Sequence, residues 1–192
     1  MQVLLRQAGK PIYGQVLREI VSAQEVATLW PAGLAGEDDE SWDWPTLVTD
    51  HPAGAWEHFE LQAAGRTQGL MIVKREVEFR APANTARSGG YIEYVAAAPW
   101  NRPPTGDTRF ERLTPVGLVM IGTAIQLSVE LGHEGRLAWH SKPGAESWYR
   151  ANLPGLWSGG PDVSEDGFEY FELTGFAARE FLTRHQQLFV EA

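Results

Sequence analysis

The longest regular pattern in the chain is a run of apolar residues at helical spacing between residues 114 and 132. The residues that recur at this spacing include Val116, Met120, Ile121, Ala124 and Leu127. Thr114 has a hydroxyl that can accept a hydrogen bond from the first turn, and Pro115 suits the first helical position. Gly132 stands where a helix is expected to stop. The pattern therefore predicts a helix that begins at Thr114 and Pro115 and ends near Gly132.

Two apolar stretches flank this helix, and both are typical of buried strands. They are residues 90–98 before the helix and residues 136–140 after it. A strand, a helix and a second strand in this order form a βαβ unit. The helix N-terminus in such a unit is a natural anion site, because its free N–H groups and its dipole favour phosphate.

The rest of the chain predicts further strands and shorter helices. The expected strands are residues 1–6, 13–20, 56–63, 68–79 and 168–173, with a hairpin turn at residues 63–67. Three shorter helices are expected. One follows a capping box at Ser22 to Glu25, one covers residues 144–152, and one begins after a cap at Thr174. Residues 45–52 are expected to be irregular or a short helix, and residues 153–167 a connection. The fold class is α/β: one domain over residues 1–192, with a mixed, mostly antiparallel sheet, a central βαβ unit and flanking helices.

Composition and charge exclude several classes of function. The chain has 192 residues, of which 43% are hydrophobic and 21% charged, as in an ordinary globular domain. The absence of cysteine excludes disulfides and thiolate metal sites. A net charge of −9 argues against a general nucleic-acid binder, which needs a basic surface. The sequence lacks a signal-peptide pattern and an apolar run of membrane-spanning length, so we expect a cytoplasmic protein that uses no membrane.

Histidines and a carboxylate lie close together in one segment, at His51, Glu57 and His58. Their spacing matches no established ligand pattern, so no metal site is predicted. His140 ends a strand, where it is either a structural histidine or a group that orients a substrate.

An acidic loop covers residues 37–40 and precedes Trp42 and Trp44. One interpretation is a solvated surface loop. The other is an acidic lip that attracts an amine, with the two tryptophans lining the pocket. The sequence leaves both open.

Four segments between residues 91 and 176 resemble the motifs of the GNAT superfamily, the acetyl-CoA-dependent N-acyltransferases. V-A-A-A-P-W-N-R, from Val95, resembles the end of the cofactor strand of that family. R-L-T-P-V-G, from Arg112 to Gly117, resembles its phosphate-binding signature Gln/Arg-x-x-Gly-x-Gly/Ala. R-L-A-W-H follows at the position of its next strand. A-E-S-W-Y-R-A-N-L-P-G then resembles the segment A-x-x-F-Y-x-x-x-G-F and aligns Tyr149 with the family tyrosine.

The resemblance implies that acetyl-CoA is the co-substrate. Its pyrophosphate would lie over the helix start, held by the backbone N–H groups of Thr114, Val116, Gly117 and Leu118. Gly117 would let the backbone approach the phosphates closely, and Arg112 would flank them. The pantetheine arm would pair with the backbone of Val95 and Ala97, as an added strand does.

The sequence departs from the family pattern at three places. Pro115 stands at the first motif glycine and has no N–H to donate. Residues 100–111 form a longer loop than the usual link between strand and helix. Ser141 and Lys142 follow the next strand, where many family members carry asparagine.

The reaction that the resemblance implies is direct attack of an amine on the acyl thioester. It needs a proton donor for the leaving thiolate, a base for the amine, and donors for the oxyanion. Tyr149 is the expected proton donor, and Glu93 on the central strand is the expected base. Glu172 on the last strand is a reserve candidate, and the backbone amide of Val95 or Ala97 would meet the oxyanion.

We therefore expect an N-acetyltransferase that acts on a primary amine of a small molecule or a peptide. Two alternatives stay open: a GNAT-fold acyl-CoA sensor without catalysis, and a protein-interaction domain that binds no cofactor. The sequence does not identify the acceptor, because selectivity lies in variable loops. A homodimer is the commonest assembly for such domains.

Overall fold

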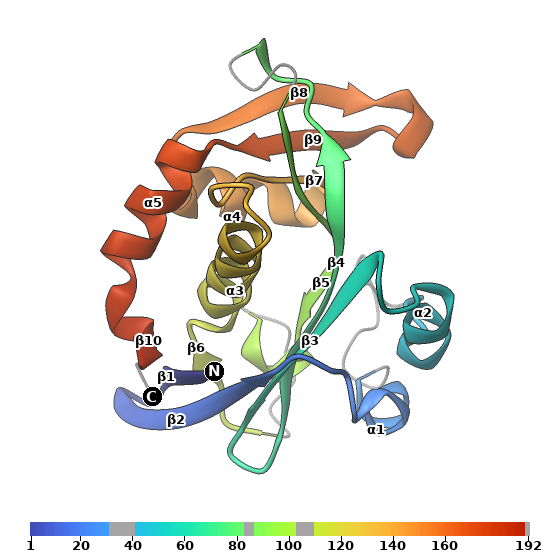
Figure 1. Ribbon diagram of the computed structural model, residues 1–192. Coiled ribbons are helices and arrows are strands. Elements are labelled where there is room, and N and C mark those ends of the chain that lie inside the picture. The colour runs from blue at the N-terminus through green and yellow to red at the C-terminus, as the bar shows by residue number, and fades with distance from the viewer. Residues whose placement is uncertain (31–40, 83–86, 103–109, 191–192) are drawn as a thin grey trace. The chain divides into compact units, whose positions relative to one another are not determined.

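The computed structural model describes residues 1–30, 41–82, 87–102 and 110–190 (Figure 1). The chain forms two compact units. The first contains Met1–Ile72, Tyr94–Met120 and the C-terminal residues from Gln187, and the second contains Val73–Glu93 and Ile121–Gln186. Among the elements that contribute residues to both units are β4 (Arg66–Glu78), β5 (Ser88–Ala97) and α3 (Val116–Glu130).

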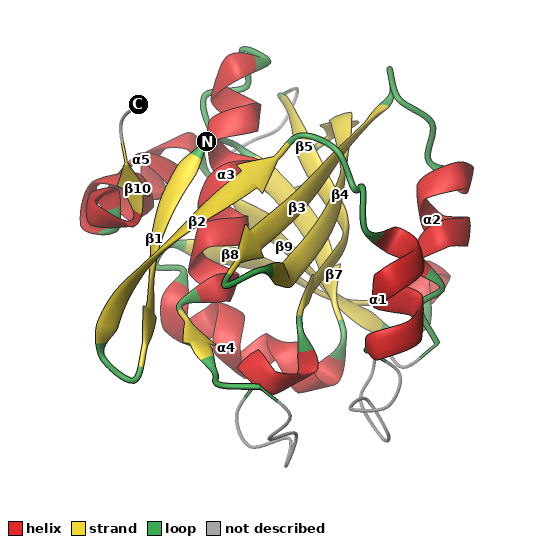
Figure 2. Cartoon of the chain, turned by 90° about the horizontal axis from the view of Figure 1, so that it is seen from below, coloured by secondary structure: helices red, strands yellow, loops and turns green. Residues whose placement is uncertain are grey.

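Antiparallel strands form the sheet of the first unit (Figure 2). β1 (Gln2–Gln7) pairs with β2 (Lys10–Leu17), and β2 pairs with β3 (Trp56–Ala63), which neighbours β4. The short strands β6 (Leu113–Thr114) and β10 (Phe189–Val190) both pair with β1. Two turns, at Ala8–Gly9 and Ala64–Gly65, have consecutive residues at positive φ. This backbone matches the twist of the flanking strands, and it confirms the hairpin predicted at residues 63–67.

Tryptophans dominate the core that covers one side of this sheet. α1 (Ala23–Leu29) and α2 (Trp44–Asp50) lie next to each other there (Figure 2). Trp30 and Trp44 meet edge to face at 6.3 Å between ring centroids. Trp44 is 3% exposed, so it belongs to the core and not to the wall of an open pocket. Residues 45–52 were predicted to be irregular or a short helix, and the presence of α2 confirms the short helix.

The start of α1 is held by a buried carboxylate instead of the predicted capping box. Ser22 makes no side-chain cap bond within the described residues; its Oγ donates to Oε1 of Glu60 at 2.8 Å. The backbone amides of Val21 and Ser22 donate to Oε2 at 2.9 and 3.1 Å. Thr67 Oγ1 and Gln62 Nε2 donate to Oε1, each at 2.8 Å. The prediction for Ser22 was therefore right about the helix start and wrong about its cap.

The second unit contains the one parallel pairing among the described strands of its sheet. β5 pairs in parallel with β7 (Leu137–Ser141), at Gly90 to Ile92. β7 pairs antiparallel with β9 (Phe168–Leu173), and β9 pairs antiparallel with β8 (Leu156–Asp162). Because β8 lies inside residues 153–167, the prediction of a plain connection there is wrong. The β8–β9 pairing has a register shift between Ser158 and Gly160, which interrupts the alternation that a strand prediction needs.

Helices α3, α4 (Pro143–Asn152) and α5 (Gly175–Arg184) follow the predicted order. α3 ends where expected: His133 N donates to Ser128 O at 2.8 Å, and Gly132 N donates to Val129 O at 3.0 Å. With Gly132 at φ 83°, these bonds form a Schellman motif. The predicted cap of α5 is confirmed, since the Thr174 hydroxyl accepts from Ala177 N at 3.2 Å.

The architecture is mixed α/β, with a mostly antiparallel sheet and one βαβ unit formed by β5, α3 and β7. This confirms the predicted fold class. Within the described ranges, no helix has both the length and the apolar character that crossing a membrane requires.

Candidate functional site

The start of α3 presents unpaired backbone amides. Val119 N donates to Pro115 O at 3.2 Å, so Pro115 is the N-cap and Val116 the first helical residue. Thr114 lies in β6 and pairs with Arg6 of β1, so the prediction that it caps the helix is wrong. The amides of Val116, Gly117 and Leu118 have no acceptor among the described residues.

Proline at the N-cap removes only one of the four amides that a helix leaves unpaired at its start. Three amides remain, and they point out of the first turn together with the positive end of the helix dipole. Gly117 and Leu118 are partly exposed, whereas Val116 is buried. This arrangement can bind a phosphate group.

A glycine brings the start of α3 close to the central strands. A Cβ atom on Gly69 of β4 would lie 3.2 Å from Ala96 O and 3.2 Å from Val116 Cγ1. It would also lie 3.4 Å from Met120 Cγ. The first turn of α3 therefore lies against β4 beside the end of β5, and all of these residues belong to the first unit.

A buried polar network fixes the loop that leaves β5. Asn101 Nδ2 donates to Gln68 Oε1 at 2.8 Å, and Trp100 Nε1 donates to the same oxygen at 3.1 Å. Ala98 N donates to Gln68 O at 2.9 Å. Asn101 Oδ1 accepts from Leu113 N at 2.7 Å, directly before the start of α3. Asn101 thus ties the end of β5 to the approach of the helix.

Val95 and Ala97, the residues predicted to pair with pantetheine, are partly exposed on β5, between the buried Ala96 and Ala98. The described pairs between β5 and β7 end at Ile92. The Ala97 carbonyl already accepts a hydrogen bond of 2.8 Å from Arg102 Nε. A carbonyl oxygen has two lone pairs, so it can accept a second bond.

Arg112, predicted to flank the phosphates, is exposed two residues before the end of β6. Its guanidinium makes no hydrogen bond or ion pair with another described residue. Arginine in such a setting can pair with a phosphate through several N–H groups.

Tyr149, the predicted proton donor, lies on α4 and is 7% exposed. Its ring lies 5.1 Å from that of Trp139, 5.3 Å from Trp148 and 6.2 Å from Phe171, centroid to centroid. Burial raises the pKa of the Tyr149 hydroxyl well above its ordinary value, so the group keeps its proton.

Glu93, the predicted base, is exposed on β5. It stands two residues after Tyr91 and so shares its side of the strand. Tyr149 contacts Trp139 and Phe171, which pair across β7 and β9 on the other side of the sheet. The structure thus places both predicted reacting groups in the second unit, on opposite sides of its sheet.

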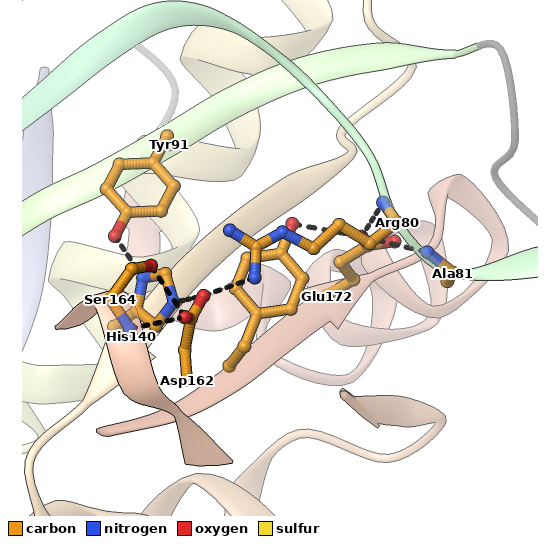
Figure 3. A network of polar contacts seen from close by, with 8 residues as sticks. Arg80, Ala81, Tyr91, His140, Asp162, Ser164 and Glu172 are labelled. Atoms are coloured by element: carbon orange, nitrogen blue, oxygen red, sulfur yellow. Dashed lines mark hydrogen bonds and ion pairs between the residues drawn. The ribbon is translucent and has the colours of Figure 1, made fainter. Parts of the chain in front are cut away.

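A chain of polar side chains lies on the Tyr91 side of this sheet (Figure 3). Tyr91 Oη and His140 Nδ1 are 2.5 Å apart, and His140 Nε2 lies 3.1 Å from Asp162 Oδ2. Asp162 also forms an ion pair with Arg80 and accepts hydrogen bonds from the amide and hydroxyl of Ser164 at 3.0 and 2.6 Å. The hydrogen bonds from Ser164 and Arg80 hold the pKa of Asp162 well below its ordinary value. Sequence reasoning noted His140 alone, because the other members of this network come from β5, from the end of β8 and from the residues that follow β4.

Glu172, the reserve candidate, is fully buried. Its Oε1 accepts from the backbone amides of Arg80 and Ala81 and from the Tyr170 hydroxyl at 2.9 Å. These bonds tie the chain after β4 to β9. Glu172 therefore stabilises the fold and is not free to take up a substrate proton.

The histidines near α2 do not form a metal-binding group. His51 packs edge to face on Trp56 at 4.5 Å and on Tyr94 at 5.4 Å, and its Nδ1 lies 2.7 Å from Leu47 O. His58 Nε2 is buried without a hydrogen-bond partner among the described residues. The described ranges contain no cluster of three or more histidine or carboxylate side chains that could hold a metal ion.

The acidic residues 37–40 lie outside the described residues. Trp42, predicted to line a pocket beside them, is partly buried and contacts Tyr94 at 5.0 Å and Trp44 at 5.8 Å.

Comparisons with known proteins find solved structures whose fold resembles that of this chain. No protein-family model matches the sequence, and no curated protein matches it. The GNAT domain of PAT from S. lividans superposes with a TM-score of 0.55 at 11% identity, over 90% of this chain and 95% of that one. A mutant of the toxin AtaT, bound to the C-terminus of the antitoxin AtaR and acetyl-CoA, gives 0.56 at 12% identity, over 91% and 99%. FeeM, an N-acyl amino acid synthase from uncultured soil microbes, gives 0.54 at 12% identity, over 89% and 95%.

Proposed function

We propose that this chain, which has the fold of the GNAT N-acyltransferases, transfers an acyl group from acyl-CoA to a primary amine. The observation that supports it most is the start of α3. There the amides of Val116, Gly117 and Leu118 have no acceptor among the described residues. Gly69 keeps this turn beside the end of β5. A nucleotide diphosphate and an amide-bearing tail need these two features together.

The residues of the first unit fit coenzyme A. The three amides after Pro115 would hold the pyrophosphate, and Arg112 would add a positive charge. Thr114 is paired in β6, so we assign the donors to the residues that follow Pro115. The backbone of Val95 and Ala97 would pair with the pantetheine amides.

Acetyl-CoA, when bound, supplies an activated acyl thioester. Tyr149 would protonate the departing thiolate, a role that fits a hydroxyl whose raised pKa keeps it protonated. Glu93, the base expected from the sequence, lies on the other side of the sheet from Tyr149, so it would not share a reacting centre with that hydroxyl, and we leave the base unassigned. The amide of Val95 or Ala97 would donate to the oxyanion. The acceptor is a primary amine on a small molecule or a peptide, and the enzyme would act as a monomer or a homodimer.

Thioester cleavage tests the proposal. Release of free thiol from acetyl-CoA is measured with a panel of primary amines: ethanolamine, phenethylamine, spermidine, glycinamide and Nα-acetyl-lysine. We expect amine-dependent release that Gly117→Val reduces strongly, because its side chain would stand between the amides and the phosphates. Phe176→Ser on the exposed side of α5 is the matched control. Failure of acetyl-CoA to bind would contradict the proposal.

The hydrogen bond from Arg102 to the Ala97 carbonyl favours a second candidate function, an acyl-CoA sensor without turnover. The Ala97 carbonyl, with which the pantetheine arm would pair, already accepts a hydrogen bond from within the protein. Saturable binding of acetyl-CoA without thiol release in the presence of any amine would support the sensor.

A further inference from the structure

A polar cavity of about 480 Å³ lies in the first unit. Its lining comes from β1, β2, α1, the end of β3 and the start of β4. All of its lining residues belong to the first unit, and none is among those assigned to coenzyme A. A volume of this size is within the range of sites that bind small molecules.

Three glutamines of the cavity form a row across neighbouring strands. Gln15 of β2 pairs with Gln2 of β1 on one side and with Gln62 of β3 on the other. Directly paired residues point to the same face of a sheet, at the strand spacing of about 4.8 Å. A carboxamide both donates and accepts hydrogen bonds, as a peptide bond does. The row therefore suits a ligand that contains peptide bonds.

A buried carboxylate fixes the orientation of one carboxamide in this row. Glu60 is fully buried and accepts from Gln62 Nε2 at 2.8 Å. Burial raises the pKa of Glu60, but the hydrogen bonds that it accepts outweigh burial and lower the pKa, so the group is an anion at neutral pH. An anionic carboxylate only accepts, so the NH₂ group of Gln62 faces Glu60. The carbonyl oxygen of Gln62 has no donor among the described residues and can accept from a ligand.

The lining also includes a guanidinium that is held in place without the use of its N–H groups. The Cζ atom of Arg66 lies 3.7 Å from the centroid of the Phe110 ring. This cation–π contact orients the guanidinium. Its N–H groups make no hydrogen bond or ion pair with another described residue. An oriented guanidinium can donate two parallel hydrogen bonds to a carboxylate.

A carboxylate, Glu25 of α1, lines the same cavity and is exposed. Glu25 forms no ion pair with Arg66 and no hydrogen bond through its side chain with another described residue. The cavity thus presents a negative group and a positive group separately, together with uncharged carboxamides. A molecule with an ammonium at one end, a carboxylate at the other and peptide bonds between them is complementary to this arrangement.

We propose that this cavity binds a short peptide by its two free ends. The ammonium lies at Glu25, the carboxylate lies at Arg66, and the peptide bonds contact the row of glutamines. The inference goes beyond acyl transfer, because it concerns residues to which the proposed reaction gives no role. Binding is reversible and includes no covalent step.

Calorimetric titration of the full chain with triglycine tests the proposal. Triglycine is compared with N-acetyl-triglycine, which lacks the ammonium, and with triglycinamide, which lacks the carboxylate. We expect saturable binding of triglycine and about 10- to 100-fold weaker binding of each capped peptide, as for the loss of one charged hydrogen-bonded contact. Glycine should bind more weakly than triglycine, because it has no peptide bond to contact the glutamines.

Two variants assign the ends of the peptide. Glu25→Gln should weaken triglycine binding about as much as N-acetylation does, and it should leave the affinity for N-acetyl-triglycine unchanged. Arg66→Gln should have the same relation to triglycinamide. Such non-additivity identifies a direct contact, and the unchanged affinity for the capped peptide shows that the variant is folded. Glu19→Gln and Arg179→Gln remove exposed charges outside the cavity and are the matched controls.

The outcomes separate this inference from the proposed function. Absence of saturable triglycine binding to the wild-type chain would overturn it, and so would equal affinities for the free and the capped peptides. Variants at Glu25 and Arg66 that weaken free and capped peptides alike would also overturn it. Glycine that binds as tightly as triglycine would overturn the assignment to a peptide. A chain that binds triglycine but not acetyl-CoA would overturn the acyl transfer alone and leave the peptide site standing.

Discussion

The side-chain oxygen of Asn101 accepts a hydrogen bond of 2.7 Å from the backbone amide of Leu113, which lies 12 positions further along the chain. The same side chain donates to Gln68 Oε1 at 2.8 Å. One buried amide group therefore connects β4, the end of β5 and the approach to α3. We infer that it sets the position of the helix start that holds the proposed pyrophosphate site.

Asn101→Ala should weaken both the fold and coenzyme A binding. It leaves Leu113 N without its buried acceptor and removes one of the two side-chain donors to Gln68 Oε1, which costs on the order of 1 to 3 kcal/mol in the free energy of unfolding. Urea unfolding and calorimetric titration with coenzyme A measure the two effects. Asn152→Ala on α4, which removes a hydrogen bond of 2.8 Å to Trp148 O, is the control. It should leave coenzyme A affinity unchanged, and an equal loss of affinity in both variants would contradict the role of Asn101.

Gly69→Ala should displace the first turn of α3. The new Cβ would lie 3.2 Å from Ala96 O and from Val116 Cγ1, so the helix or the strand must move. Overpacking of this kind typically costs about 1 to 3 kcal/mol, and we expect weaker coenzyme A binding in addition. Gly90→Ala is the matched variant in the second unit, where the new Cβ meets the end of the Leu137 side chain at 3.2 Å. Unaltered coenzyme A affinity in Gly69→Ala would show that the close approach does not serve the site.

Glu60→Gln should destabilise the protein at neutral pH and much less in acid. Burial alone would raise the Glu60 pKa, but hydrogen bonds from Gln62, Ser22 and Thr67 outweigh it and lower the pKa below 4.5. A lowered folded-state pKa contributes stability above the unfolded-state pKa and loses it as pH falls through the folded-state value.

The measurement for Glu60 is urea unfolding of wild type and variant between pH 7 and pH 3. The difference in unfolding free energy should be about 1.5 to 3 kcal/mol at pH 7 and should shrink below about pH 4.5. Glu25→Gln replaces an exposed carboxylate on α1 and should change stability little. A difference that stays constant across this range would contradict the buried ionised carboxylate.

Tyr149→Phe should lower kcat without changing the affinity for coenzyme A. Loss of a general acid typically reduces the rate about 100- to 10,000-fold. The pKa of Tyr149 is raised above its ordinary value of about 10, so its ionisation should not limit the wild-type rate below that pH. Steady-state kinetics between pH 6 and 10 measure the loss in kcat and its pH dependence. Tyr13 is 69% exposed, so Tyr13→Phe is the control. A fall in rate near neutral pH caused by loss of the Tyr149 proton would contradict the assignment.

Elements with a clear period were predictable from the sequence, and elements whose form depends on distant partners were not. The helix that begins at Val116 and ends before Gly132 has a regular apolar face and a glycine stop. β8 escaped prediction because glycines at 159 and 160 and the register shift beside Ser158 break its alternation. Ser22 has the sequence of a capping residue, but a buried carboxylate 38 positions away takes its hydroxyl.

The candidate site was predictable where it follows from local backbone and not where it depends on strand register. The amides at Gly117 and its neighbours follow from the helix start alone. The contact of Tyr91 with His140 requires β5 and β7 to pair in parallel at one register, which pattern analysis does not fix. The hydrogen bond between Asn101 and Leu113 likewise joins two residues that lie 12 positions apart in the sequence.

The most direct test of the account is the change in backbone amide resonances of the ¹⁵N-labelled chain on titration with coenzyme A. We expect saturable shifts that are largest at Val116, Gly117 and Leu118 and extend to Val95 and Ala97, because these groups hold the pyrophosphate and the pantetheine arm. Absence of saturable shifts, or shifts confined to other parts of the chain, would contradict the proposed site at the start of α3.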